Sequence, residues 1–232
     1  MRECQYFSYG DTEVEYLKAR DPKLAEVIDQ VGHVNRQVIP DLFQALVNSI
    51  VGQQISTKAQ ETIWRRIEER FDPITPGRMA AVPAEELQSC GISLRKAGYI
   101  RGIANRMMDG TLDLELLQTL PDDQVCKALD ALPGIGVWTA EMLMIFSMQR
   151  PDILSFGDLG IQRGLRMVYH HRNITPELFQ KYRRRYSPYG TTASLYLWAV
   201  AGGAVEGMRD YAPGKKKEKK PCQSRGNRQE NE

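Results

Sequence analysis

Residues 129–140 read Leu-Asp-Ala-Leu-Pro-Gly-Ile-Gly-Val-Trp-Thr-Ala, and this stretch decides the fold. A helix before it is predicted to end at Leu132, because Pro133 cannot continue a helix. Gly134 and Gly136 carry no Cβ, so the backbone can turn tightly there and begin a second helix at once. The pattern therefore predicts two helices joined by a short glycine-containing hairpin.

The hairpin has a chemical consequence at the start of its second helix. The first amide N–H groups of a helix have no partners within it, and they lie at its positive end. A phosphate group fits such a site without any basic side chain. On local chemistry alone, a plain turn between two packed helices is the alternative interpretation.

Helical periodicity extends from the hairpin over most of the chain, whereas alternating strand patterns are hard to find. A core helix after Pro40 is indicated by an apolar stripe that consists of Leu42, Phe43, Leu46, Val47 and Ile50. Start and stop signals place further helices at residues 56–71, 83–91, 93–110, 121–132, 136–148, 158–168, 175–186 and 188–204. With one or two more at residues 11–31, we expect an all-α fold of about ten helices.

Charge is nearly balanced over the 232 residues, with 31 Lys and Arg against 29 Asp and Glu. This balance argues weakly against a protein that holds polyanions by bulk charge alone. Residues 214–232 carry seven basic and three acidic side chains, a charge of +4, which leaves −2 for residues 1–213. Their composition predicts a disordered basic tail, which is either a solvated solubility element or a transient grip on phosphates. We therefore divide the chain into an N-terminal helical segment (1–39), a helical body (40–213) and this tail (214–232).

The cysteines are scattered along the chain at Cys4, Cys90, Cys126 and Cys222, without a Cys-x-x-Cys pair. This spacing indicates neither a zinc site nor a disulfide framework, and a reducing compartment is the simpler interpretation. No stretch approaches the roughly 20 apolar residues that a membrane span needs, and the first residues lead into no apolar signal core. We therefore expect a cytoplasmic protein without membrane contact.

A second motif follows the hairpin, since residues 156–160 read Phe-Gly-Asp-Leu-Gly, with Asp158 twenty-two residues beyond Gly136. Upstream, residues 49–56 read Ser-Ile-Val-Gly-Gln-Gln-Ile-Ser, and downstream Trp198 follows a leucine. With these motifs the chain resembles the helix-hairpin-helix DNA glycosylase superfamily, in particular its 3-methyladenine DNA glycosylase II branch, over about residues 40–207. The resemblance implies two helical subdomains with an active-site cleft between them, in a compact form without the β-sheet domain of larger bacterial members.

The same resemblance implies a monofunctional enzyme of base excision repair, which acts as a monomer on double-stranded DNA at the nucleoid. It would flip out alkylated purines such as 3-methyladenine and 7-methylguanine and hydrolyse their N-glycosidic bond. Superfamily members that also cleave the strand carry a lysine nucleophile where this chain has Trp138, and an indole cannot attack the sugar. Only Cys222 follows Asp158, so an iron–sulfur cluster is excluded. We expect no required cofactor and no lyase activity.

Asp158 is the catalytic residue by this resemblance. As the base departs, the sugar gains oxocarbenium charge, which an ionised carboxylate stabilises while it orients or deprotonates a water molecule. Because Asp158 precedes a predicted helix, a plain N-cap is the alternative interpretation, and the two roles can coexist.

The resemblance assigns substrate binding to Trp138, Trp198 and Gln53. An alkylated purine carries a positive charge, so stacking on an indole gains a cation–π contribution of about 0.5–2 kcal/mol. Packing in the core is the alternative for either tryptophan, and it is the interpretation that we favour for Trp64.

Contacts with DNA are implied for Gln54 and for the hairpin residues Gly134, Ile135, Gly136, Val137 and Thr139. Gln54 would fill the gap left by the flipped nucleotide, where better-known bacterial members carry leucine. Gln53 and Gln54 could otherwise cap or bridge helices. From the resemblance alone, the hairpin could also hold a structural monovalent cation through the backbone carbonyls of Asp130, Leu132 and Ile135.

Two other functions stay open at this point. One is a non-catalytic helix-hairpin-helix protein that only binds DNA, and the other is a glycosylase for a different damaged base, such as hypoxanthine or 8-oxoguanine. Asp158 and the two tryptophans favour an enzyme over a binding module, because binding alone needs none of them.

Overall fold

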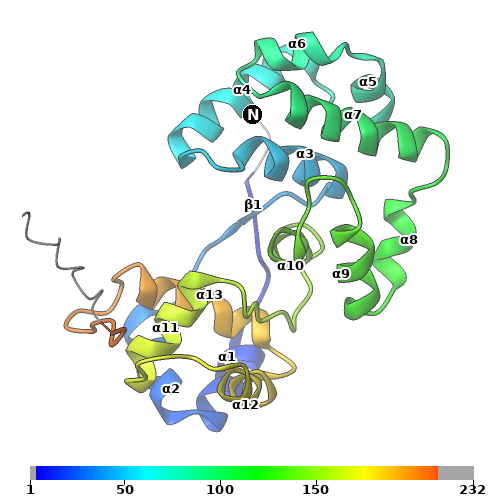
Figure 1. Cartoon of the computed structure of the whole chain (residues 1–232). Coiled ribbons are helices and arrows are strands. Elements are labelled where there is room, and N and C mark those ends of the chain that lie inside the picture. The colour runs from blue at the N-terminus through cyan, green and yellow to red at the C-terminus, as the bar shows by residue number, and fades with distance from the viewer. Residues whose placement is uncertain (1–3, 214–232) are drawn as a thin grey trace, which may run out of the picture.

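A computed structural model describes residues 4–213 of the chain (Figure 1). Cys222 and the predicted tail lie outside the described residues. Within them the elements are β1 (Gln5–Tyr6), α1 (Asp11–Arg20), α2 (Pro22–Val31), β2 (Gln37–Val38), α3 (Leu42–Gly52), α4 (Thr57–Phe71), α5 (Pro76–Ala81), α6 (Ala84–Ser89), α7 (Leu94–Met108), α8 (Leu114–Thr119), α9 (Asp122–Asp130), α10 (Val137–Phe146), α11 (Leu159–Tyr169), α12 (Pro176–Tyr186) and α13 (Gly190–Ala201). The all-α prediction is confirmed, with a single two-stranded sheet of two residues per strand.

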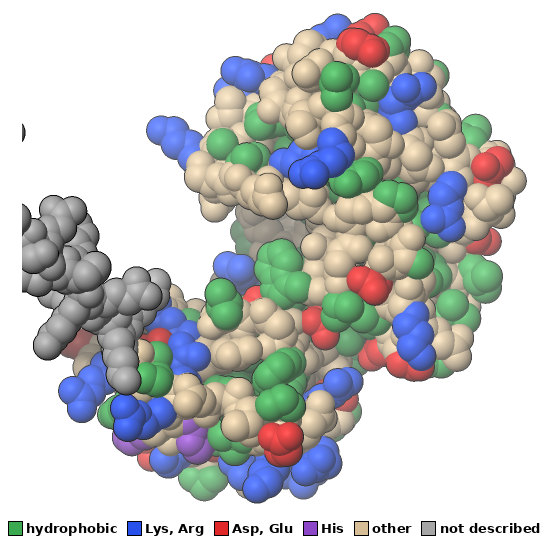
Figure 2. All heavy atoms as spheres, viewed as in Figure 1, with side chains coloured by type: hydrophobic (Ala, Val, Ile, Leu, Met, Phe, Trp, Pro, Cys, Tyr) green, Lys and Arg blue, Asp and Glu red, His purple; other side chains and the backbone are tan. Residues whose placement is uncertain are grey.

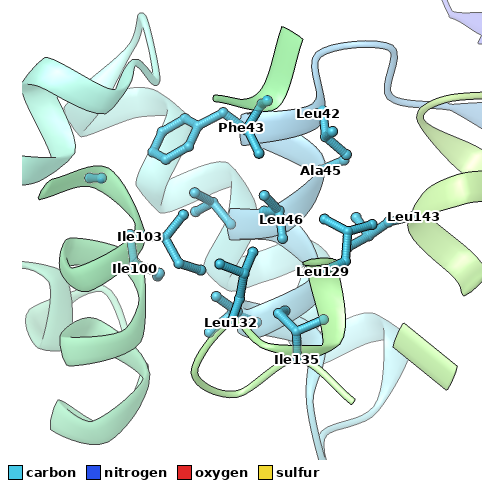
Figure 3. Packing of buried hydrophobic residues seen from close by; sticks show 14 of the residues in the cluster. Leu42, Phe43, Ala45, Leu46, Ile100, Ile103, Leu129, Leu132, Ile135 and Leu143 are labelled. Atoms are coloured by element: carbon cyan, nitrogen blue, oxygen red, sulfur yellow. The ribbon is translucent and has the colours of Figure 1, made fainter. Parts of the chain in front are cut away.

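Two apolar cores account for the two groups of helices in Figure 1. The first core lies among α3–α10, and Figure 3 shows Leu46 of α3 between Ile100 and Ile103 of α7 on one side and Leu143 of α10 on the other. The second core joins α1, α2 and α11–α13, and Tyr186 is one of its fully buried members. Each fully buried large side chain contributes about 1.5–3 kcal/mol by its removal from water.

The N-terminal segment packs on the second group of helices. Gln5 pairs with Val38 in the antiparallel sheet, so residues 5–38 form a loop that contains α1 and α2. Phe7 and Val38 pack with Leu195 of α13 in a small third cluster. The segment is therefore integrated into the helical body through buried side chains.

The hairpin forms as predicted between α9 and α10, although α9 ends at Asp130, two residues early. Gly134 has a φ of +84°, and a Cβ there would lie 2.4 Å from Cδ2 of Tyr99, so this turn needs a glycine. The prediction that Gly136 is also needed for the turn is wrong. Its φ of −107° suits any residue, and a Cβ there would meet nothing within 4 Å. The first residues of α10 after it, Val137 and Trp138, are about half exposed, so the start of this helix is accessible.

None of the helices in the described range is long and apolar enough to span a bilayer. Helices α5 and α8 are absent from the sequence prediction, because six residues are too few to show an amphipathic repeat; α6 is equally short and was predicted from its start and stop signals.

Candidate active site

Asp158 is the N-cap of α11, and its Oδ1 accepts a hydrogen bond of 2.8 Å from the backbone N–H of Ile161. Its side chain is buried, with 7% of the residue exposed. The cap interpretation therefore holds, and it fixes the carboxylate at the positive end of a helix.

Two indoles hold the same carboxylate from two other helices. Nε1 of Trp138 on α10 donates to Oδ2 of Asp158 at 2.8 Å, and Nε1 of Trp198 on α13 donates to Oδ1 at 2.9 Å. Trp138 is 50% exposed, whereas Trp198 is half-buried and packs against Phe146 with 5.6 Å between ring centroids. The structure thus brings the three residues together, and three N–H donors fix how the carboxylate is oriented.

A pocket of about 500 Å³ lies beside Trp138, within the size range of small-molecule sites. It is lined by Asn48, Ser49, Gly52, Gln53, Gln54, Gln60, Trp138, Thr139 and Met142. Trp198 does not line it. Figure 2 shows the surface hollowed between the two groups of helices, with α3 and α4 above the hollow and α11 and α13 below it.

The loop between α3 and α4 closes one side of this pocket. Nε2 of Gln53 donates to the carbonyl oxygen of Gly134 at 2.6 Å, so Gln53 bridges the loop to the hairpin as well as lining the pocket. Nζ of Lys96 donates to the carbonyl oxygens of Val51 and Gln53, at 2.9 and 2.7 Å. Burial lowers the pKa of Lys96, and the nearby charge of Arg95 acts in the same direction. These contacts anchor the backbone that carries Gln54.

Gln54 itself is exposed and adopts a left-handed conformation, with a φ of +58°. Such a conformation is uncommon for a residue other than glycine and often occurs at functional sites. The exposed side chain at the pocket edge fits a residue that enters the DNA helix, which is the role that the resemblance implies.

The hairpin residues differ in what they present to solvent. Ile135 is buried, so only its backbone can contact a ligand, while Val137 is 52% exposed and Thr139 lines the pocket. Gly136 supplies no side-chain cap to α10, so among residues 4–213 no side chain caps its first N–H groups. This geometry fits an anion at the start of α10.

The sequence did not predict three of the residues that line the pocket, which are Asn48, Gln60 and Met142. Nε2 of Gln60 donates to Oδ1 of Asn48 at 2.8 Å, which joins α3 to α4. Met142 lies four residues after Trp138 and therefore on the same face of α10, so helical spacing could have found it.

Trp64 is partly buried and packs against the first core, as the sequence analysis favoured. No group of three or more His, Cys, Asp or Glu side chains in residues 4–213 could hold a metal ion. Of the carbonyls considered for a cation, that of Leu132 accepts the backbone N–H of Ile135 at 3.0 Å.

Comparisons with known proteins agree with this architecture. Residues 47–188 match the family model of HhH-GPD superfamily base excision DNA repair proteins. DNA-3-methyladenine glycosylase 1 of Schizosaccharomyces pombe is 30% identical over 68% of this chain and 72% of the relative. DNA-3-methyladenine glycosylase 2 of Escherichia coli is 29% identical over 70% of this chain, which spans 58% of that relative.

Solved structures are similar over most of the chain. DNA-3-methyladenine glycosidase from Bacillus halodurans is 38% identical, with a TM-score of 0.78 over 89% of this chain and 97% of the other. The S. pombe 3-methyladenine DNA glycosylase in complex with abasic DNA is 25% identical, with a TM-score of 0.71 over 84% of this chain and 98% of the other. The chain therefore belongs to the HhH-GPD superfamily of base excision DNA repair proteins.

Proposed function

We propose that the protein is a monofunctional DNA glycosylase, which flips alkylated purines out of double-stranded DNA and hydrolyses their N-glycosidic bond. The observation that carries the proposal is the buried carboxylate of Asp158, held by two indole N–H groups and the start of α11. The names of the relatives favour 3-methyladenine as the substrate class. The protein would act as a monomer at the nucleoid.

Asp158 would act mainly through its negative charge. Three N–H donors already occupy most of the roughly four lone-pair directions of a carboxylate, which leaves about one of them free for a water molecule. A fixed negative charge stabilises the oxocarbenium character of the sugar as the base departs. The remaining lone pair of Oδ2 could orient the attacking water molecule.

Trp138 would select the substrate. Half of its surface is exposed, and it lines the pocket, so a cationic purine can stack on the indole and gain about 0.5–2 kcal/mol of cation–π energy. A purine that is already charged leaves readily, which explains why the site needs no strong general acid. Trp138 stands where lyase members of the superfamily have lysine, so water would be the nucleophile and no strand cleavage is expected.

DNA would be held by backbone groups more than by basic side chains. The uncapped N–H groups of α10 fit a phosphate, and Gln54 would enter the helix where the nucleotide leaves it. A cation on the carbonyls of Asp130, Leu132 and Ile135 would add to this grip, and its chemistry there would be electrostatic only.

The deciding experiment compares wild-type protein with Asp158→Asn on duplexes that carry 3-methyladenine or 7-methylguanine. Asparagine keeps the N-cap oxygen but loses the charge and turns its NH2 toward the Trp138 indole N–H, so we expect base release to fall by about 10²–10³-fold, with a loss of stability of about 1–3 kcal/mol. Asp113→Asn, at the N-cap of α8, is the matched control and should leave release unchanged.

If Asp158→Asn releases base as fast as the wild type, the mechanism is wrong. A covalent adduct trapped by borohydride would contradict the monofunctional assignment. Release of neutral hypoxanthine should be slower than that of either alkylated base, because it gains no cation–π energy.

A further inference from the structure

The segment between α10 and α11 carries Asp158 and is fastened to α13 at its beginning. Oγ1 of Thr191 donates to the carbonyl oxygen of Arg150 at 2.6 Å and accepts from the backbone N–H of Ile153 at 3.0 Å. Oγ of Ser194 donates to the carbonyl oxygen of Ile153 at 3.1 Å. The helix that carries Trp198 therefore fixes the first half of the segment.

The second half is fastened to α10 instead. The side chain of Ser155 is completely buried, and its hydroxyl donates to Oε2 of Glu141. Glu141 follows Trp138 by three residues and so lies one turn along α10, while Asp158 follows Ser155 by three residues along the segment. Two parallel links, Glu141 to Ser155 and Trp138 to Asp158, thus join α10 to the segment.

Glu141 is held in unfavourable surroundings for a carboxylate. Burial raises its pKa, the Ser155 hydroxyl and the Arg183 guanidinium lower it, and the charge of Asp158 raises it further. A partly buried carboxylate next to a second one is costly, so its presence calls for a specific role.

We propose that Glu141 and Ser155 are positioning residues for Asp158. Their hydrogen bond fixes residues 155–158 against α10, so that the Asp158 carboxylate meets the Trp138 indole and faces the sugar. For its catalytic consequence the proposal rests on the function proposed above. Neither residue lines the pocket beside Trp138, so their loss should slow the chemical step and leave DNA binding unchanged.

Kinetics can separate these two effects. Ser155→Ala removes the donor, Glu141→Leu removes the acceptor, and each should slow single-turnover release of 3-methyladenine by about 10-fold, because small displacements of reacting groups are costly. The Kd for a duplex with an abasic site should stay within about 2-fold of the wild type. Glu141→Gln retains an acceptor oxygen and should restore most of the rate. The double variant should be no slower than Glu141→Leu, since one bond is lost in both.

Tyr169→Phe is the matched control. It removes the hydroxyl of a partly buried tyrosine that packs against the second core and donates to the carboxylate of Asp21 at 2.8 Å. Its rate of release should equal that of the wild type. If Tyr169→Phe slows release as much as Ser155→Ala does, the effect is one of stability and the proposal fails.

A readout without catalysis keeps the proposal separate from the proposed function. Exchange of the Trp138 indole N–H, followed by NMR, should be faster in Ser155→Ala and Glu141→Leu but not in Tyr169→Phe. If the wild type releases no alkylated base while exchange responds in this way, the proposed function fails and the positioning role stands. Unchanged exchange, or unchanged release in an active enzyme, overturns the positioning role.

Discussion

At the scale of single residues, Gly160 sets how closely Trp198 approaches Asp158. A Cβ at this position would lie 2.8 Å from Cδ1 of Trp198 and 3.1 Å from Oδ1 of Asp158. The glycine lies in the first turn of α11, where its backbone is helical and needs no positive φ. Its role is therefore to leave space for the indole.

Gly160→Ala should displace the Trp198 ring and slow base release by about 10-fold, because the donor to Oδ1 moves away. The overall fold should persist, since alanine favours a helix. Single-turnover release and thermal unfolding measure the two effects. Gly98→Ala in α7, another helical glycine where a Cβ meets nothing within 4 Å, is the control, and an equal loss of rate there would contradict the explanation.

Motifs in the sequence identify the residues that would meet the substrate but not those that place them. Asp158, Trp138 and Trp198 belong to recognisable motifs, and they meet in the structure as a group. Ser155 carries no such signal, and Gly160 ends the quoted motif without revealing its role, because their functions depend on partners 14 and 38 positions away in the chain. Contacts of this kind depend on the packing of helices, which periodicity alone does not determine.

At the scale of helices, α11 and α13 approach each other closely enough to bring Asp158 and Trp198 into contact. Gly164 makes this possible, because a Cβ there would lie 2.4 Å from the carbonyl oxygen of Leu197. That neighbour is backbone and cannot rotate away. The spacing of two helices, and with it one wall of the site, therefore depends on the absence of a single methyl group.

Gly164→Ala should lower the free energy of unfolding by about 1–3 kcal/mol, as overpacking of a close contact does. It should also slow base release, because α13 carries Trp198. Gly102→Ala in α7, where a Cβ meets nothing within 4 Å, should be neutral or slightly stabilising. Urea unfolding of both variants checks the difference, and equal stabilities would show that the helices can separate without cost.

The helices themselves follow from the sequence to different degrees. Long amphipathic helices such as α4 and α7 begin within one residue of the predicted starts, with Ser56 and Ser93 as their N-caps. The hairpin also forms where it was predicted, but only Gly134 needs its glycine conformation. The short helices α5 and α8 and the two-residue strands are stabilised by tertiary contacts, and no periodic pattern indicates them.

At the scale of the whole molecule, the two apolar cores meet at the site. Trp198 packs against both of them and against the small cluster around Phe7. Any change in the relative position of the two groups of helices would therefore move a donor to Asp158. This arrangement explains why a cleft between two cores can hold a carboxylate in one orientation.

Charge also acts at this scale, because several basic side chains of the body pair internally. Arg166 donates to both oxygens of Asp210 at 2.7 Å, and Arg185 donates to the buried Asp21 at 2.6 Å. Such arginines neutralise few phosphates. The near-balanced charge of the chain is therefore compatible with DNA binding by amide groups and helix N-termini.

Removal of residues 214–232 tests how much of the affinity for DNA comes from basic side chains, since these residues carry +4 and the rest of the chain −2. For binding to a duplex with an abasic site, the logarithm of the binding constant falls by about 0.9 for each tenfold rise in salt and each neutralised phosphate. We expect a shallow dependence that becomes shallower still without these residues, while base release at saturating protein is unchanged. Replacement of Lys215, Lys216, Lys217, Lys219 and Lys220 by glutamine should have the same effect at full length. An unchanged salt dependence in both variants would instead assign the basic residues to solubility, and all of the affinity to the helical body.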